Sequence, residues 1–246
     1  MTTLVEAIDV RKDFEALEVL KGVSFSLDKG ETLVVMGGSG SGKTVLLRLI
    51  DGLYQPDGGA IRLFGGNIEH LAEEDLLPIR RRLGYVFQSA ALFDSLTVEQ
   101  NVAFPLREHT ALPGDEIHRR AVHFLSLVGL EERVLPLLPS ELSGGMRKRV
   151  GIARALIGQP DVLLFDEPTA GLDPTNSKMV GELISELGSE VCDTAIVVTH
   201  DLELAKTVAD RVAVLIQGRF AALGRLDDVL GSRDPAVQAF LTGEAR

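Results

Sequence analysis

The chain has 246 residues, 45% of them hydrophobic, with 25 basic and 36 acidic side chains that give a formal net charge of −11. This composition fits a globular protein with a sizeable core, and the acidic balance argues against a nucleic-acid partner, which requires a cationic surface. The single cysteine, Cys192, excludes an internal disulfide and indicates a reducing compartment. The N-terminus lacks the pattern of a signal peptide, and the apolar runs are far shorter than the ~18 residues that span a bilayer.

The first part of the chain has strand patterns. Near period-two alternation predicts strands at 4–10 and 19–27, and a compact apolar run predicts a buried strand at 31–37. A helix is expected from about Lys43 to Leu53, followed by strands at 59–66 and 83–88.

The rest of the chain is helical at first and then alternates. From about Ser89 to Ala155 the periodicity predicts helices at Val98–Leu106, Asp115–Leu127 and Ser143–Ile157. Apolar runs then predict strands at 161–167, 194–200 and 211–217, with helices at 176–187, 201–209 and 234–241. Alternating helices and apolar strands indicate a mainly parallel sheet with both faces covered, interrupted by a helical insertion.

A phosphate-binding loop is predicted after the third strand. Residues 37–44, GGSGSGKT, fit the pattern G-x-x-x-x-G-K-[ST] between a strand and a helix, a context that a plain glycine-rich turn does not explain. Glycines let backbone N–H groups surround phosphate oxygens, Lys43 places a charge on the β and γ phosphates, and Thr44 offers a hydroxyl to Mg²⁺. The candidate ATP-binding residues of the loop are Gly37, Gly38, Ser39, Gly40, Ser41, Gly42, Lys43 and Thr44.

Polar side chains follow three other predicted strands. Asp166 is expected to hold Mg²⁺ through water, and Glu167 to take a proton from an attacking water. Gln88, at the end of YVFQ, has an amide suited to both the metal and the water, and His200, at the end of VVTH, is placed to bond the γ-phosphate. Ligands of α/β sheets collect at the carboxyl ends of strands, which favours these roles over helix capping or a purely structural role.

A second small-residue motif lies about a hundred residues after the first. In ELSGGMRKR, residues 141–149, a serine and two glycines lead directly into a basic, helix-forming run. The free N–H groups and the dipole at a helix N-terminus both attract an anion. The chain therefore has two candidate phosphate sites. One nucleotide bound within one chain would account for only one of them.

Together, these ordered motifs resemble those of the nucleotide-binding subunits of ABC transporters, over nearly the whole chain. The resemblance implies a single domain over 1–246 with a P-loop NTPase core and an N-terminal antiparallel β portion. The RecA-like core would cover about 1–88 and 156–230, with a helical subdomain at about 89–155 and a short C-terminal helix at about 234–242. The resemblance also implies that Phe14 stacks on adenine, the alternative being an ordinary core aromatic.

The resemblance offers a reason for the second motif. In this family ATP is sandwiched between two copies arranged head to tail, so the signature Ser143, Gly144, Gly145 and Met146 would complete the site of a second copy. Asp173, in the GLD loop, would lie near the same interface. The common signature has glutamine where this chain has Met146, so one amide contact is lost while the glycine amides remain.

A narrower similarity concerns the cargo. Residues 87–110, 139–150 and 234–241 are similar to the ATPase of Mla-type, Mce-linked phospholipid transporters of Gram-negative envelopes. The similarity implies an inner-membrane permease, an Mce-domain lipid-binding protein and a small STAS-domain subunit as partners. It places the chain at the cytoplasmic face of the inner membrane as a peripheral subunit. An importer ATPase for another small solute, or a soluble ABC ATPase, stays open as an alternative.

Two basic triplets, at 80–82 and 147–149, have no role in these motifs. They are interpreted as solvated helix faces or intrachain ion pairs. The alternative is contact with the permease or with lipid headgroups.

Overall fold

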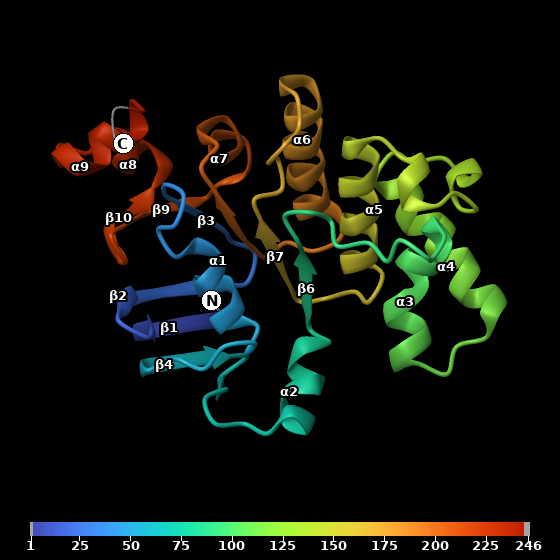
Figure 1. Ribbon diagram of the computed structural model, residues 1–246, viewed down its shortest axis with the longest axis horizontal. Coiled ribbons are helices and arrows are strands. Elements are labelled where there is room, and N and C mark those ends of the chain that lie inside the picture. Colours follow the sequence, from blue (N-terminus) through green and yellow to red (C-terminus); the bar gives the residue numbers. More distant parts are fainter. Residues whose placement is uncertain (1, 244–246) are drawn as a thin grey trace.

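The computed structural model describes residues 2–243, with the side chains of 189 and 190 excepted. Residues 1 and 244–246, which the sequence prediction included in the domain, lie outside this range. Two sheets lie side by side, and three packed helices flank the larger sheet at the β6 end (Figure 1).

The smaller sheet is antiparallel and comes from the N-terminal part of the chain. Its order is β2-β1-β4-β5, with β1 at Thr3–Phe14, β2 at Leu17–Asp28, β4 at Gly58–Leu63 and β5 at Gly66–Asn67. β1 pairs with both β2 and β4, and its buried residues pack toward the larger sheet. The predicted N-terminal antiparallel portion is therefore confirmed.

The larger sheet is mainly parallel, with the order β10-β9-β3-β8-β7-β6. Its strands are β3 Thr32–Met36, β6 Leu83–Val86, β7 Val162–Asp166, β8 Ala195–Thr199, β9 Arg211–Ile216 and β10 Arg219–Arg225. All neighbours pair in parallel except β10, which is antiparallel to β9. The predicted α/β class is confirmed.

Alternate residues of the central strands belong to two different cores. In β3, Leu33 and Val35 pack with α1 (Lys43–Ile50) and the antiparallel sheet, whereas Val34 and Met36 pack on the opposite side. That opposite side is covered by α6 (Pro174–Glu190) and α7 (Leu202–Val208). A strand buried on both faces needs an unbroken apolar run, which explains the sequence pattern of β3, β7 and β8.

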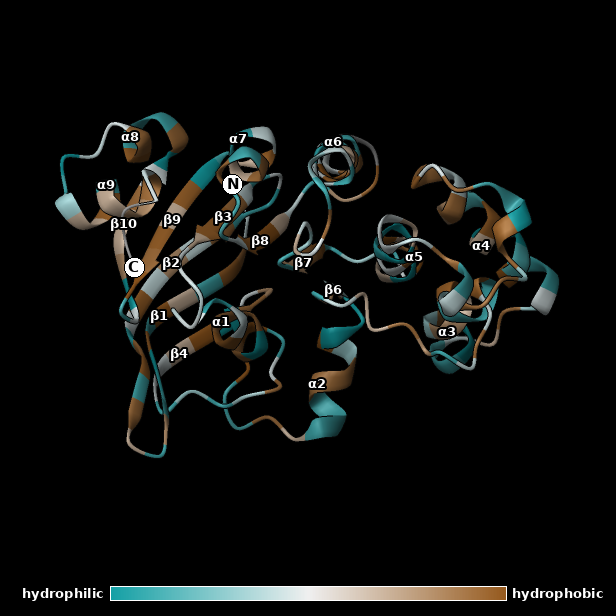
Figure 2. Ribbon diagram, turned by 45° about the horizontal axis from the view of Figure 1, so that its top comes forward, coloured by the Kyte–Doolittle hydropathy of each residue, from teal (hydrophilic) through white to brown (hydrophobic). Residues whose placement is uncertain are grey.

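The helical insertion consists of α3 (Val98–His109), α4 (Gly114–Leu127) and α5 (Gly144–Leu156). Figure 2 shows these helices grouped on one side of the molecule, away from the antiparallel sheet. Helix α5 also contacts β6 and α6, so it joins the insertion to the larger sheet. Two 3-10 turns, at Glu132–Val134 and Pro139–Glu141, connect α4 to α5.

The structure also contains elements that the sequence patterns did not predict. These are α2 (Glu73–Arg80), α8 (Leu226–Leu230), β5 and β10. The C-terminal helix is present as α9 (Pro235–Leu241).

Several predicted boundaries were wrong, among them the end of β1, which lies at Phe14 rather than residue 10, and the end of α3, which lies at His109 rather than Leu106. Helix α1 ends at Ile50 rather than Leu53, and β6 ends at Val86 rather than at Gln88.

Candidate functional site

The phosphate loop joins β3 to α1, and its backbone is shaped by glycine. Gly42 precedes α1 with a φ of 105°, a left-handed conformation that disfavours other residues. A Cβ atom on Gly37 would lie 2.6 Å from the carbonyl oxygen of Leu215 and from Ser41 Oγ. The loop therefore requires glycine at both positions.

The Lys43 ammonium lies inside this loop. Its side chain is almost fully buried, and Nζ donates to the carbonyl oxygens of Gly37, at 2.8 Å, and Gly38, at 3.0 Å. Nζ also forms an ion pair with Glu167 Oε1 at 3.1 Å. A single cation thus joins the phosphate loop to the carboxylate that follows β7.

Two features of the loop fit a bound phosphate and a divalent cation. Ser41 Oγ is buried and has no hydrogen-bond partner within the described part of the chain, so an acceptor supplied by a ligand would satisfy it. Thr44 Oγ1 donates to Asp166 Oδ1 at 2.9 Å, which brings together two oxygen ligands of the kind that Mg²⁺ prefers. The residues present therefore fit nucleotide phosphates with Mg²⁺.

Asp166 ends β7 in a partly apolar setting. Burial raises the pKa of its carboxyl, whereas the hydrogen bonds from Thr44 and from Tyr85, at 3.3 Å to Oδ2, lower that pKa. A carboxylate buried in this way is stabilised by a neighbouring positive charge, which a metal ion supplies.

Glu167 has both carboxylate oxygens engaged. Oε1 pairs with Lys43, and Oε2 lies 2.9 Å from His200 Nδ1 and accepts from the backbone N–H of His200 at 3.3 Å. The backbone of Glu167 is left-handed, with a φ of 47°, and its side chain is 11% exposed. The structure therefore brings together Lys43, Glu167 and His200, three residues that sequence analysis selected separately.

Gln88 and Phe14 are less directly connected to this cluster. Gln88 is exposed and lies two residues beyond the end of β6, and its carbonyl oxygen accepts from Lys148 Nζ. Phe14 ends β1 and is partly exposed, with its ring centroid 5.4 Å from that of Tyr54 and 5.3 Å from Lys12 Nζ. The adenine contact of Phe14 and the metal contact of Gln88 stay predictions.

The second motif opens α5, as expected from its sequence. Ser143 is the N-cap, and its Oγ accepts from the backbone N–H of Met146 at 3.2 Å. Gly145 is buried, and a Cβ atom there would lie 2.7 Å from Asn176 Oδ1. The N-terminus of α5 is therefore packed closely against the start of α6.

Asp173 lies next to this motif and is the N-cap of α6. Its carboxylate accepts from the backbone N–H groups of Thr175, at 3.0 Å, and Asn176, at 3.1 Å. The Asn176 side-chain amide, the nearest hydrogen-bond donor, lowers the pKa of Asp173. Over residues 2–243, no hydrogen bond joins residues 143–146 or Asp173 to the phosphate loop at 37–44.

The basic triplets have partners that the sequence did not reveal. Arg80 donates to the carbonyl oxygens of Asp51 and Gly52 and pairs with Glu73, and Arg82 pairs with Asp161, so ion pairing is confirmed there. The interpretation is wrong for Lys148, which is buried and donates to main-chain carbonyl oxygens. A buried lysine in a basic run has no sequence signal that separates it from its exposed neighbours.

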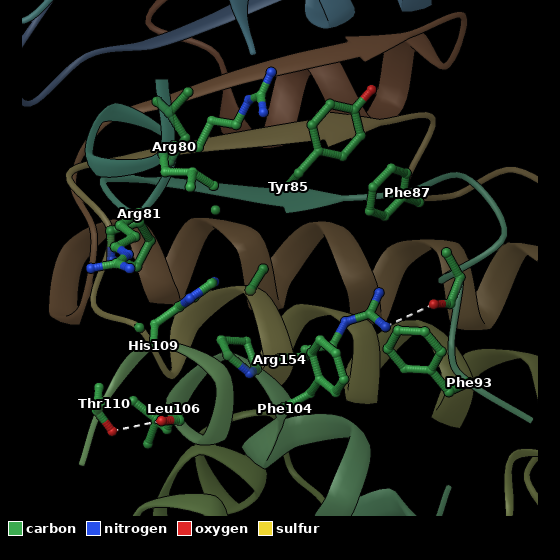
Figure 3. A pocket seen from close by; sticks show the side chains of 18 residues that line it. Arg80, Arg81, Tyr85, Phe87, Phe93, Phe104, Leu106, His109, Thr110 and Arg154 are labelled. Carbon is green, nitrogen blue, oxygen red and sulfur yellow. Dashed lines mark hydrogen bonds between the residues drawn. The ribbon is translucent and has the colours of Figure 1, made fainter. Parts of the chain in front are cut away.

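A groove lies between β6 and the helical insertion. It has a volume of about 660 Å³ and is lined mainly by apolar side chains, with Phe87 and Phe93 exposed and Arg154 beside them (Figure 3). Figure 3 shows Arg154 donating to the loop after β6, where it bonds the carbonyl oxygen of Ala91 at 2.7 Å. The groove therefore adjoins the segment that contains Gln88.

The described residues contain neither a cluster of metal-ligating side chains nor a membrane-spanning helix. Within residues 2–243, no three His, Cys, Asp or Glu side chains cluster as a metal site. In the same range, no helix has the length and apolar character needed to cross a bilayer.

Comparison with protein families gives one match over more than half of the chain. Residues 20–170 match the family described as ABC transporter. The chain is 41% identical over 227 residues to the intermembrane phospholipid transport system ATP-binding protein MlaF of Escherichia coli strain K12, which covers 92% of this chain and 84% of that protein. It is also 38% identical to the methionine import ATP-binding protein MetN of Mesorhizobium japonicum, over 99% of this chain and 66% of that protein.

Solved structures give the same family. The chain resembles the dimeric post-hydrolysis state of the ATP-binding cassette MJ0796 bound to ADP and Pi, with a TM-score of 0.83 and 35% identity. That match covers 91% of this chain and 99% of the cassette.

Proposed function

The chain belongs to the ABC transporter family and is the ATP-hydrolysing subunit of a transporter, and we propose that it drives phospholipid movement between the inner and outer membranes of a Gram-negative envelope. The similarity to MlaF carries this proposal, because it extends over most of both chains. The similarity to MetN is nearly as high and supports the second candidate, an importer of another small solute.

The residues of the cluster have complementary roles in this proposal. The phosphate loop and Lys43 would bind the β and γ phosphates, and Thr44, Asp166 and Gln88 would hold Mg²⁺, which would neutralise phosphate charge. Glu167 accepts the proton of the attacking water. His200, 2.9 Å from the Glu167 carboxylate, orients that base and bonds the γ-phosphate.

A second copy of the chain completes the site. In the signature at the start of α5, Ser143 is exposed, Gly144 and Met146 are half-buried and Gly145 is buried, and the free N–H groups of this helix end favour an anion. Within one chain this motif has no nucleotide phosphate to bind. In a dimer it would bind the γ-phosphate of the partner's nucleotide in trans. Asp173 lies beside it, and loss of the γ-phosphate on hydrolysis would loosen the dimer.

The groove beside β6 is where we place the permease. Phe87 and Phe93 in this groove are exposed, and the groove adjoins the Gln88 loop, so a bound partner would contact a segment that leads directly to the nucleotide. The partners would also include an Mce-domain protein and a small STAS-domain subunit, with the chain at the cytoplasmic face of the inner membrane.

The cargo is tested by isolating the complex from its native membrane and by deleting the gene. We expect a permease and an Mce-domain protein to co-purify, and deletion to disturb outer-membrane lipid asymmetry and raise detergent sensitivity. Complementation with Lys43→Ala should fail to restore either phenotype, whereas the exposed-site control Lys206→Ala should restore both. A complex that contains a permease for amino acids or sugars and no Mce protein would contradict the lipid proposal and leave the ATPase assignment intact.

A further inference from the structure

Lys148 is a buried cation with no role in the reaction described above. It lies in the second turn of α5, and only 6% of its surface is exposed. Burial lowers the pKa of its amine, while the carboxylates of Glu167 and Asp166 raise that pKa. A buried ammonium is unfavourable unless hydrogen bonds compensate for its lost hydration, so its partners show what it stabilises.

The partners of Lys148 belong to two different segments of the ATP site. Nζ donates to the carbonyl oxygen of Gln88 and, at 3.3 Å, to the carbonyl oxygen of Glu167. These residues follow β6 and β7, which are adjacent parallel strands, so their segments leave the sheet side by side. The Lys148 side chain thus connects the loop that contains Gln88 to the backbone of Glu167, the proposed base.

The backbone of Glu167 is in a conformation that needs such support. Its φ of 47° is unfavourable for a residue with a side chain. Its N–H donates to Val198 at 2.9 Å, and its carbonyl oxygen accepts from Ala170 at 3.1 Å as well as from Lys148. This backbone directs the carboxylate toward Lys43 and His200.

The loop that contains Gln88 rests on the same helix. Arg154 donates to the carbonyl oxygens of Ala90 and Ala91, both at 2.7 Å, and a Cβ atom on Gly151 would lie 3.3 Å from Ala90. Ala90 and Ala91 also have positive φ values. Helix α5 therefore holds the loop at several points through Arg154, which is half-buried, and Lys148, which is buried and also reaches Glu167.

We infer that Lys148 is a positioning residue that couples the Gln88 loop, at the edge of the groove, to the backbone of Glu167. A displacement of this loop would move the Lys148 amine and, through it, the peptide that orients the Glu167 carboxylate. The inference rests on the proposed role of Glu167 as the base. It predicts an effect on the chemical step with little effect on nucleotide binding, because Lys148 does not contact the phosphate loop.

The first test measures the backbone itself in nucleotide-free protein. Lys148→Met removes the charge and the donors at similar length, and Arg149→Met is a matched control, since Arg149 donates to the carbonyls of Val128 and Gly129 instead. Hydrogen exchange should become about tenfold faster in segments 87–91 and 167–172 of Lys148→Met and stay unchanged there in the control. Unchanged exchange in both segments of Lys148→Met would overturn the inference.

The second test separates binding from chemistry in the assembled complex. Lys148→Met should lower kcat roughly 10–100-fold with KM for ATP within about threefold, and Lys148→Arg, which keeps charge and donors, should recover most of the loss. A kcat within about threefold of wild type, or an equal loss in Arg149→Met, would refute the coupling. If Lys148→Met fails to fold, Lys148→Gln replaces it with the same expected outcomes.

The two readouts distinguish this inference from the function on which it rests. If Glu167→Gln kept near-normal turnover, the role of Glu167 as the base would be wrong. The exchange experiment would still decide whether Lys148 holds the two segments together.

Discussion

At the residue scale, the two oxygens of the Glu167 carboxylate contact two different basic side chains. Lys43 is 3.1 Å from one oxygen and His200 is 2.9 Å from the other. Phosphate oxygens bound in the loop would compete with Glu167 for the Lys43 ammonium, because all three groups meet at the carboxyl ends of β3 and β7. Release from Lys43 would leave Glu167 free to accept a proton from water.

Glu167→Gln tests the role of this carboxylate. An amide cannot accept the proton, so turnover in the assembled complex should fall roughly 10²–10⁴-fold while ATP binding is kept and ATP-bound dimers accumulate. Steady-state ATPase assays with nucleotide titration measure both quantities. Glu203→Gln, at an exposed position paired with Lys206, is the control, and near-normal turnover of Glu167→Gln would exclude a general-base role.

Met146→Gln tests the unusual signature residue. The Met146 side chain packs against the helical core, and its backbone N–H is used by the Ser143 cap. Phosphate contacts in this motif would come from backbone groups and Ser143, so turnover should stay within a few-fold of wild type. A collapse of turnover in a folded, assembled protein would show that the methionine side chain contributes directly.

At the element scale, α1 ends on an unfavourable charge. Asp51 is the C-cap of α1, where the helix dipole disfavours a carboxylate. Burial raises the pKa of Asp51 to about 6, Arg80 lowers it and Glu73 raises it further. The folded state therefore binds a proton more tightly than the unfolded state, so the contribution of this group to stability falls as the pH rises from roughly 4 to roughly 6 and stays at its lowest level above that range.

Asp51→Asn should remove this penalty. We expect the free energy of unfolding to increase by on the order of 1–3 kcal/mol at pH 8 and to change little near pH 4. Asp57→Asn is the matched control with the opposite sign, because a hydrogen bond from the Asp13 N–H and one from Lys12 lower the pKa of Asp57. Denaturant unfolding at the two pH values measures both, and a smaller stability of Asp51→Asn at pH 8 would contradict the assignment.

The elements that sequence analysis predicted are those with strong periodicity or unbroken apolar runs. Helix α2 was missed because it contains Pro78 and buries only Leu76, so it has no apolar stripe. Strand β10 alternates between exposed and half-buried residues and has no fully buried position. Such elements are specified by tertiary contacts, which a local pattern does not contain.

In the candidate site, likewise, the residues that belong to local sequence motifs were predictable and the contacts that depend on the fold were not. Lys43, Thr44, Asp166 and Glu167 occur in local motifs with a known chemistry, and the structure places them together. The contacts of Lys148 join segments 60 and 19 positions away in sequence, and both acceptors are main-chain oxygens that any residue type would supply. No residue pattern could reveal these contacts before the fold was known.

At the scale of the whole molecule, the two phosphate motifs lie on separate helices. The phosphate loop precedes α1, between the two sheets, and the signature precedes α5, in the helical insertion beside β6 (Figure 1). A head-to-tail dimer would bring the loop of one chain to the signature of the other. This arrangement predicts which combinations of lesions leave one composite site intact.

Two defined dimers test the trans arrangement with Lys43→Ala and Ser143→Arg. With one lesion in each chain, both fall in the same composite site, so the second site should still occlude ATP. With both lesions in one chain and none in the other, each composite site carries one lesion and neither should occlude ATP. Thermal melting checks folding, because replacing the Ser143 cap costs about 1 kcal/mol.

The measurement is ATP occlusion in linked or separately tagged dimers, since turnover can require two working sites. Lys43→Ala removes the ammonium that the phosphate loop holds, and Ser143→Arg blocks the start of α5 by bulk. Occlusion in the first dimer should therefore be about half that of the unmodified dimer, and close to zero in the second. A site built within each chain predicts the reverse order, because the first dimer would then have two damaged sites and the second would keep one. More occlusion in the second dimer than in the first would rule out the trans arrangement, even though each motif is well formed on its own helix.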